Sequence, residues 1–88
     1  MNKYELIPQY SSRASFYGKA EVHDEYLTIT LYSYKTPILT LDRRTGEITW
    51  HEFRESTTTT AHIKEFLQQQ GLKVFKTFKE IKKYYYNE

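Results

Sequence analysis

The stretch ESTTTTAHIKEFLQQQG, residues 55–71, decides how the second half of the chain folds. Ile63, Phe66 and Leu67 follow the three- and four-residue spacing of one helix face. Gly71 stands where helices commonly end in the left-handed conformation. The stretch therefore predicts an amphipathic helix from about Thr58 to Gln70 that lays its apolar stripe on a sheet.

The four threonines at the start of this stretch favour a helix beginning. A Ser or Thr hydroxyl can accept from the free N–H groups there, and threonine suits the extended backbone before a cap. Glu55, Ser56 and the threonines are all plausible in the approach and the cap. Of these we expect one of the threonines to be the cap, with Thr57 and Thr58 as structural candidates. His62 is expected to fix the helix start by hydrogen bonding to the preceding strand. The alternative is a hydroxyl-lined ligand or phosphate site at this helix end.

The first two-thirds of the chain alternates apolar and polar residues at the period of a strand. The DRRTG segment at 42–46 is typical of a hairpin turn, and Pro37 predicts an interruption over 33–37. The predicted strands cover residues 16–23, 27–32, 38–41 and 47–53, with a short edge strand over 3–8. The pattern predicts an α+β fold in one domain over 1–88, an antiparallel meander of four to five strands followed by one or two C-terminal helices packed on the sheet.

The C-terminal segment LKVFKTFKEIKKYYYNE also has helical spacing. Its apolar stripe is Val74, Phe78, Ile81 and Tyr85, and lysines occupy the rest of the circumference. We predict a second helix from about Lys76 to Tyr85, although the three consecutive tyrosines are equally compatible with a strand.

Composition excludes several classes of protein. The 88 residues include no cysteine, so the chain has no disulfide and no thiolate metal site. No apolar run is long enough to span a membrane, and the net charge of +2 does not demand an acidic partner. These features favour a cytoplasmic protein with no membrane association.

Catalytic and metal-binding motifs are not evident. The three histidines lack the spacing of a zinc site, and the three glycines form no phosphate-binding loop. No nucleophile elbow occurs. We therefore expect a protein that is not an enzyme, needs no cofactor or metal and has no small-molecule substrate.

Tyrosines and basic residues are the binding candidates. Tyr32, Tyr34 and Lys35 stand together, and Tyr17 and Tyr26 are expected to join them on the solvent side of the sheet, where aromatic rings can stack on bases. The alternative is a half-buried tyrosine surface. A second set of residues, all basic, is expected to contact phosphate: Arg43, Arg44, Lys76, Lys79 and Lys83. The alternative is that these side chains form a solvated surface.

Three stretches carry a family resemblance: SFYGKA (15–20), LYSYKTPI (31–38) and STTTTAHIKEFLQQQG (56–71). Together, over residues 13–71, they resemble a domain of unknown function common in small proteins of phages and other bacterial mobile elements. Ala61 stands where that pattern usually carries arginine. The resemblance implies an accessory protein in the bacterial cytoplasm that binds a host protein, including components of defence systems, and it supplies no catalytic residues.

Two function classes follow. The first is stoichiometric binding to a host protein, which agrees with the nine tyrosines because tyrosine is favoured at interfaces. The second is nucleic-acid binding through the hairpin arginines and the lysines of the C-terminal segment. Glutamates interspersed among these basic residues dilute the positive field, so host-protein binding is the preferred hypothesis. The sequence leaves open whether the protein forms a homo-oligomer.

Overall fold

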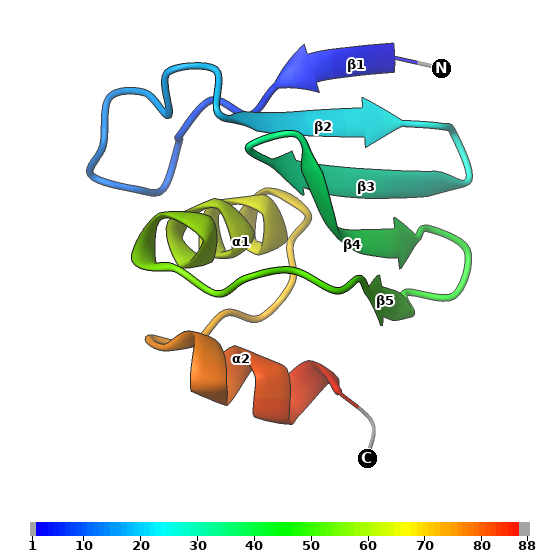
Figure 1. Cartoon of the computed structure of the whole chain (residues 1–88). Coiled ribbons are helices and arrows are strands. Elements are labelled where there is room, and N and C mark those ends of the chain that lie inside the picture. Colours follow the sequence, from blue (N-terminus) through cyan, green and yellow to red (C-terminus); the bar gives the residue numbers. More distant parts are fainter. Residues whose placement is uncertain (1, 87–88) are drawn as a thin grey trace.

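The computed structural model describes residues 2–86, which form a five-stranded antiparallel sheet followed by two helices (Figure 1). Each strand pairs with the next one along the chain. The predicted α+β meander is therefore confirmed. The elements are β1 (Asn2–Glu5), β2 (Ala20–Asp24), β3 (Thr28–Ser33), β4 (Thr36–Asp42), β5 (Ile48–Trp50), α1 (Thr57–Gln69) and α2 (Phe78–Tyr85).

The predicted strand boundaries are wrong at several ends. The strand expected from residue 16 begins only at Ala20, because Tyr17 and Gly18 adopt left-handed backbone with φ of 55° and 73°. Leu27 lies in the β2–β3 turn and is exposed. β5 ends at Trp50 instead of Phe53, and the edge strand covers 2–5 instead of 3–8.

The interruption predicted over 33–37 is a two-residue turn. Tyr34 and Lys35 both have positive φ, 52° and 66°, as in the type I′ turns that suit the twist of a hairpin. Pro37 lies inside β4, opposite Tyr32, while Leu39 pairs with Leu31. Ile38 is thus the extra residue of a β-bulge, and the bulge lets both Ile38 and Leu39 be buried.

The cap of α1 is Ser56, which was among the plausible residues, and the expectation that one of the threonines caps the helix is wrong. The Ser56 Oγ accepts from the Thr59 N–H at 3.1 Å, and Thr57 to Thr60 form the first turn. At the other end Gly71 has a φ of 75°, and the Leu72 N–H reaches the Leu67 carbonyl at 2.9 Å. This is a Schellman ending, with Gly71 in the left-handed role that was predicted.

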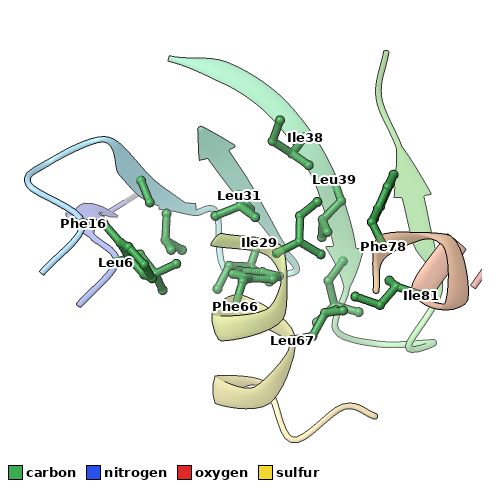
Figure 2. Packing of buried hydrophobic residues seen from close by; sticks show 14 residues of the cluster. Leu6, Phe16, Ile29, Leu31, Ile38, Leu39, Phe66, Leu67, Phe78 and Ile81 are labelled. Atoms are coloured by element: carbon green, nitrogen blue, oxygen red, sulfur yellow. The ribbon is translucent and has the colours of Figure 1, made fainter. Parts of the chain in front are cut away.

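The core lies between one face of the sheet and the two helices (Figure 2). Ile63, Phe66 and Leu67 are fully buried, as their spacing predicts. Leu6 and Phe16, from the long β1–β2 loop, close the core at one end. The buried residues from the sheet are Ala20, Val22, Ile29, Leu31, Ile38, Leu39 and Leu41.

α2 begins two residues later than predicted, at Phe78. Thr77 caps it in a reciprocal capping box with Glu80, which satisfies two of the free N–H groups at the helix start. Phe78 and Ile81 are buried, and the Phe78 ring lies 5.7 Å from the Trp50 ring. The helix is therefore anchored beside β5. Neither helix within residues 2–86 combines the length and apolarity needed to cross a bilayer.

Candidate functional site

The three stretches that carry the family resemblance meet at the N-terminal end of α1. A hollow of about 360 Å³, called the His62 hollow below, opens there between the β1–β2 loop, the β3–β4 turn and α1. Its lining includes Arg13, Ser15, Tyr17, Lys19, Tyr34 and His62. Residues far apart in sequence thus form one site.

Strand pairing brings these segments together. Ala20, at the start of β2, pairs with Ser33, at the end of β3, and the Tyr34 N–H donates to the Lys19 carbonyl at 2.7 Å. The turns that contain Tyr17 and Tyr34 therefore lie at the same end of the sheet. In Figure 1 the start of α1 faces this end, beside the β1–β2 loop.

A chain of hydroxyls connects the helix cap to His62. Ser56 Oγ donates to Thr59 Oγ1 at 3.1 Å, and the buried Thr59 and Ser33 hydroxyls share a hydrogen bond of 3.2 Å. Ser33 Oγ and His62 Nδ1 share another, of 2.9 Å. The Nδ1 nitrogen of the imidazole is therefore paired within the protein. His62 thus links α1 to β3. The expectation that it would bond to the strand preceding the helix is wrong.

The His62 ring is fully buried and neutral at neutral pH. Burial lowers its pKa from 6.5 to about 4, and the nearby positive charge of Arg13 acts in the same direction. The Phe16 ring meets the imidazole edge-on, with centroids 4.6 Å apart. Among the described residues nothing pairs with Nε2, which is itself buried. His62 thus holds a buried ring nitrogen without a hydrogen-bond partner in the described chain.

The rim of the hollow is aromatic and positively charged. Tyr17 is 81% exposed and Tyr34 is 51% exposed, and each is held in left-handed backbone that bulky residues rarely adopt. The Lys19 ammonium lies 5.6 Å from the centre of the Tyr34 ring, within the range of a cation–π contact. Arg13 and Lys19 line the hollow, and no carboxylate does. Glu5 instead accepts from the Gly18 N–H at 2.9 Å.

A second hollow, of about 520 Å³, adjoins the first on the other side of Arg13. Lys64, Lys76 and the α1 cap contribute to its lining, together with Glu55. Ala61 also lines it, at the position where the resembling pattern usually carries arginine. Ala61 does not line the His62 hollow.

The predicted tyrosine surface does not form as one patch. Tyr32 points away from the helices, and its ring stacks on His23 with centroids 3.8 Å apart. Tyr26 lies in the β2–β3 turn, at the opposite end of the sheet from Tyr17 and Tyr34. Only Tyr17, Tyr34 and the neighbouring Lys35 share one corner of the molecule.

The hairpin arginines are already paired with carboxylates. Arg43 grips Asp24 through two bonds of 2.6 and 3.0 Å, and Arg44 contacts Asp42 at 3.0 and 3.2 Å. These contacts hold the pKa of each carboxyl below its ordinary value. Neither arginine is therefore free for phosphate without breaking its pair.

The lysines of the C-terminal segment do not form a single stripe. Lys79 and Lys83 are exposed on α2, one helical turn apart. Lys76 precedes the helix, and its carbonyl accepts from the Lys64 ammonium at 3.1 Å. The two groups of lysines border different hollows.

Sequence reasoning missed Glu65, a fully buried carboxylate on α1. It accepts backbone N–H bonds from Gln9, Tyr10 and Ser11 at 2.8 to 3.2 Å, and one of 2.6 Å from the Gln69 amide. Burial alone would raise its pKa, but these hydrogen bonds outweigh burial and lower it. Glu65 therefore fastens the β1–β2 loop, which carries Arg13, to the helix.

The position of Glu65, three residues after His62 and on the edge of the apolar stripe, was the one available signal for a buried carboxylate. Arg13 and Lys19 were also missed, because nothing local separates them from other exposed cations. Within residues 2–86 no three His, Asp or Glu side chains gather as a metal site would require.

Comparison with known proteins gives a family without an assigned activity. No curated protein and no solved structure matches the chain. A family model matches residues 4–84, which extends past the resembling stretches at both ends and includes most of the C-terminal segment, and it carries no indication of a phage or mobile-element source. The chain belongs to the family of unknown function DUF8033.

Proposed function

We propose that this protein is a small, non-enzymatic accessory protein of a phage or mobile element that binds a host protein stoichiometrically. The observation that supports this function is the corner formed by Tyr17, Tyr34 and Lys35. Two exposed tyrosines project there from tight turns at the same end of the sheet. Tyrosine supplies a large contact area at a low cost in conformational entropy, which suits the centre of a protein interface.

The surroundings of this corner favour a rigid binding surface. Hydrogen bonds from backbone N–H groups of the adjoining loop to the Glu65 carboxylate hold that loop to α1, and the bond between the Tyr34 N–H and the Lys19 carbonyl joins the two turns. A surface that is ordered before binding loses less entropy when a partner docks. The ionic surface at the other end of the sheet is occupied by its own Arg–Asp pairs and offers less to a partner.

The test is capture from a bacterial lysate treated with nuclease. Wild-type protein is expected to retain a host protein, and the Tyr17→Ser/Tyr34→Ser double variant is expected to lose it. Tyr26→Ser is a matched control, because Tyr26 is 83% exposed and also has positive φ but lies at the far end of the sheet. Equal loss in the control, or capture that nuclease abolishes, would contradict the proposal. Size-exclusion chromatography would show whether a second copy is the partner.

Nucleic-acid binding is the second candidate, favoured by the exposed Lys79 and Lys83 on α2. Duplex affinity should then fall with salt at a slope near −0.9 for each phosphate contact. Replacing Lys76, Lys79 and Lys83 by glutamine should flatten that slope by about two to three units while leaving the melting curve nearly unchanged. Because Arg43 and Arg44 are paired, we expect weak binding without length dependence. Sub-micromolar binding at physiological salt, lost in the triple variant, would reverse the order of the two candidates.

A further inference from the structure

The buried Nε2 of His62 is the feature that the contacts within the chain leave unexplained. A buried polar group without a partner costs about 1–3 kcal/mol, and native structures rarely keep one. Trp50 Nε1 is the other buried side-chain nitrogen without a partner among residues 2–86, but the Trp50 ring packs against the rings of Phe78 and Tyr86. His62 instead forms part of a hollow with charged walls.

The charges around the His62 hollow determine which sign of charge a ligand must carry. Arg13 and Lys19 line it without a carboxylate, and Arg13 makes no ion pair within the described chain. A cation would be repelled, and an uncharged apolar ligand would leave all of these donors unpaired. The hollow therefore favours an anion.

The arrangement of the donors favours an anion with several oxygens. Ser15 Oγ accepts from the Tyr17 N–H at 2.8 Å, so its own proton remains available, and Thr58 of α1 also lines the hollow. The Arg13 guanidinium and the Lys19 ammonium add charged donors to the same lining. A phosphoryl group offers acceptor oxygens in several directions and accepts such charge-assisted bonds.

We infer that the His62 hollow is a binding site for the phosphoryl group of a ligand, with Arg13 and Lys19 as the neutralising cations. In this site Ser33 donates to His62 Nδ1, and the imidazole carries its proton on Nε2, which is the buried donor to the ligand. Tyr17 and Tyr34 flank the entrance, where the group that carries the phosphate would lie. The exposed tyrosine rings can move aside to admit it. This inference goes beyond host-protein binding and stands without it, because it concerns the floor of the hollow and a small anionic group.

The experiment is a titration of ¹⁵N-labelled protein with three phosphorylated probes: inorganic phosphate, adenosine 5′-monophosphate and O-phosphoserine. Adenosine and serine are the uncharged-group controls. At least one phosphorylated probe should saturate, with an affinity about tenfold or more above its unphosphorylated counterpart. The His62 Nε2–H resonance should move on saturation. The tightest probe identifies whether a nucleotide or a phosphorylated side chain carries the group.

Variants separate this site from general attraction to a basic protein. Arg13→Gln and Lys19→Gln should each weaken the best probe by about tenfold, and neither should change the thermal melt, because both side chains are exposed. Lys64→Gln removes a cation that lines the second hollow and not the His62 hollow, and it should leave affinity unchanged. No preference for phosphorylated probes, equal weakening by Lys64→Gln, or an unmoved His62 resonance would each overturn the inference. Purified protein and small probes are used, so a failed capture from lysate does not affect the result.

Discussion

Acidification from pH 7 to pH 4 should destabilise this protein through His62. The unfolded chain binds a proton on this histidine near pH 6.5, whereas the folded chain resists it until about pH 4, because the ring is buried and Arg13 adds positive charge. Between these pH values the unfolded state binds more protons than the folded state. The free energy of unfolding must therefore rise with pH across this window and fall as pH is lowered through it.

The size of the effect follows from the two pKa values. A fall from 6.5 to about 4 corresponds to about 3 kcal/mol at 1.36 kcal/mol for each pH unit. The stability that depends on a neutral His62 is fully present above pH 6.5 and is lost as the pH falls towards 4. For a chain of 88 residues, whose total stability is about 5–10 kcal/mol, such a loss is large. Glu65 also makes stability fall with acidification, but because its pKa is lowered, the stability it contributes is lost only below about pH 4.5, its ordinary pKa.

Urea melts followed by circular dichroism at pH 7, 6, 5 and 4 would measure this loss. His62→Asn keeps an acceptor for Ser33 but does not titrate, so its stability should be lower at pH 7 and nearly flat down to pH 5. Arg13→Gln should raise the pKa of His62 in the folded state and thereby reduce the total loss. His23→Gln, which removes a histidine from the outer face of the sheet, should keep the wild-type profile.

Two results would refute this reasoning. A wild-type profile that is flat between pH 6.5 and pH 4 would mean that the imidazole accepts a proton without cost in the folded state. A His62→Asn variant that retains the full slope would mean that other groups cause it.

Three further predictions concern the packing of α1. Phe66→Ala should cost about 3–5 kcal/mol in urea melts, since the ring is fully buried, and a loss below about 1 kcal/mol would show that the packing face is wrong. Ser56→Ala should cost about 1 kcal/mol while Thr57→Ala stays near neutral; the reverse order would contradict Ser56 as the cap. Glu65→Gln should cost about 2–3 kcal/mol and speed hydrogen exchange at Gln9 to Ser11, and unchanged exchange there would disprove the tether.

The fold could be predicted from the sequence wherever local periodicity coincided with burial. The spacing of Ile63, Phe66 and Leu67 placed α1, and Gly71 marked its end, because a helix face and a left-handed ending leave signals within a few residues. Alternation placed the strands but not their ends. At Tyr17 and Tyr34 the chain turns through left-handed backbone at tyrosine, where Gly or Asn would be the usual signal.

The candidate site was much less predictable, because its members come together only through long-range pairing. The register between Ala20 and Ser33 brings Lys19 next to Tyr34, and the hydroxyl chain connects residues more than twenty positions apart. Residue type alone suggested Arg43 and Arg44, whose nearby carboxylates neutralise them. Arg13 looks identical in sequence but has no such partner within the described residues.

Strained turns by themselves do not mark a functional site in this chain. Tyr26 has a φ of 75°, more distorted than Tyr17 or Tyr34, yet its turn is explained by structure alone: the Tyr26 N–H donates to Asp24, which Arg43 also grips. Tyr17 and Tyr34 lack an equivalent ion pair, and beside them lies a buried histidine nitrogen without a hydrogen-bond partner among the described residues. In so small a domain each of these features costs a sizeable part of the stability. Their coincidence at one hollow, and not the strain alone, is the reason to look for a ligand there.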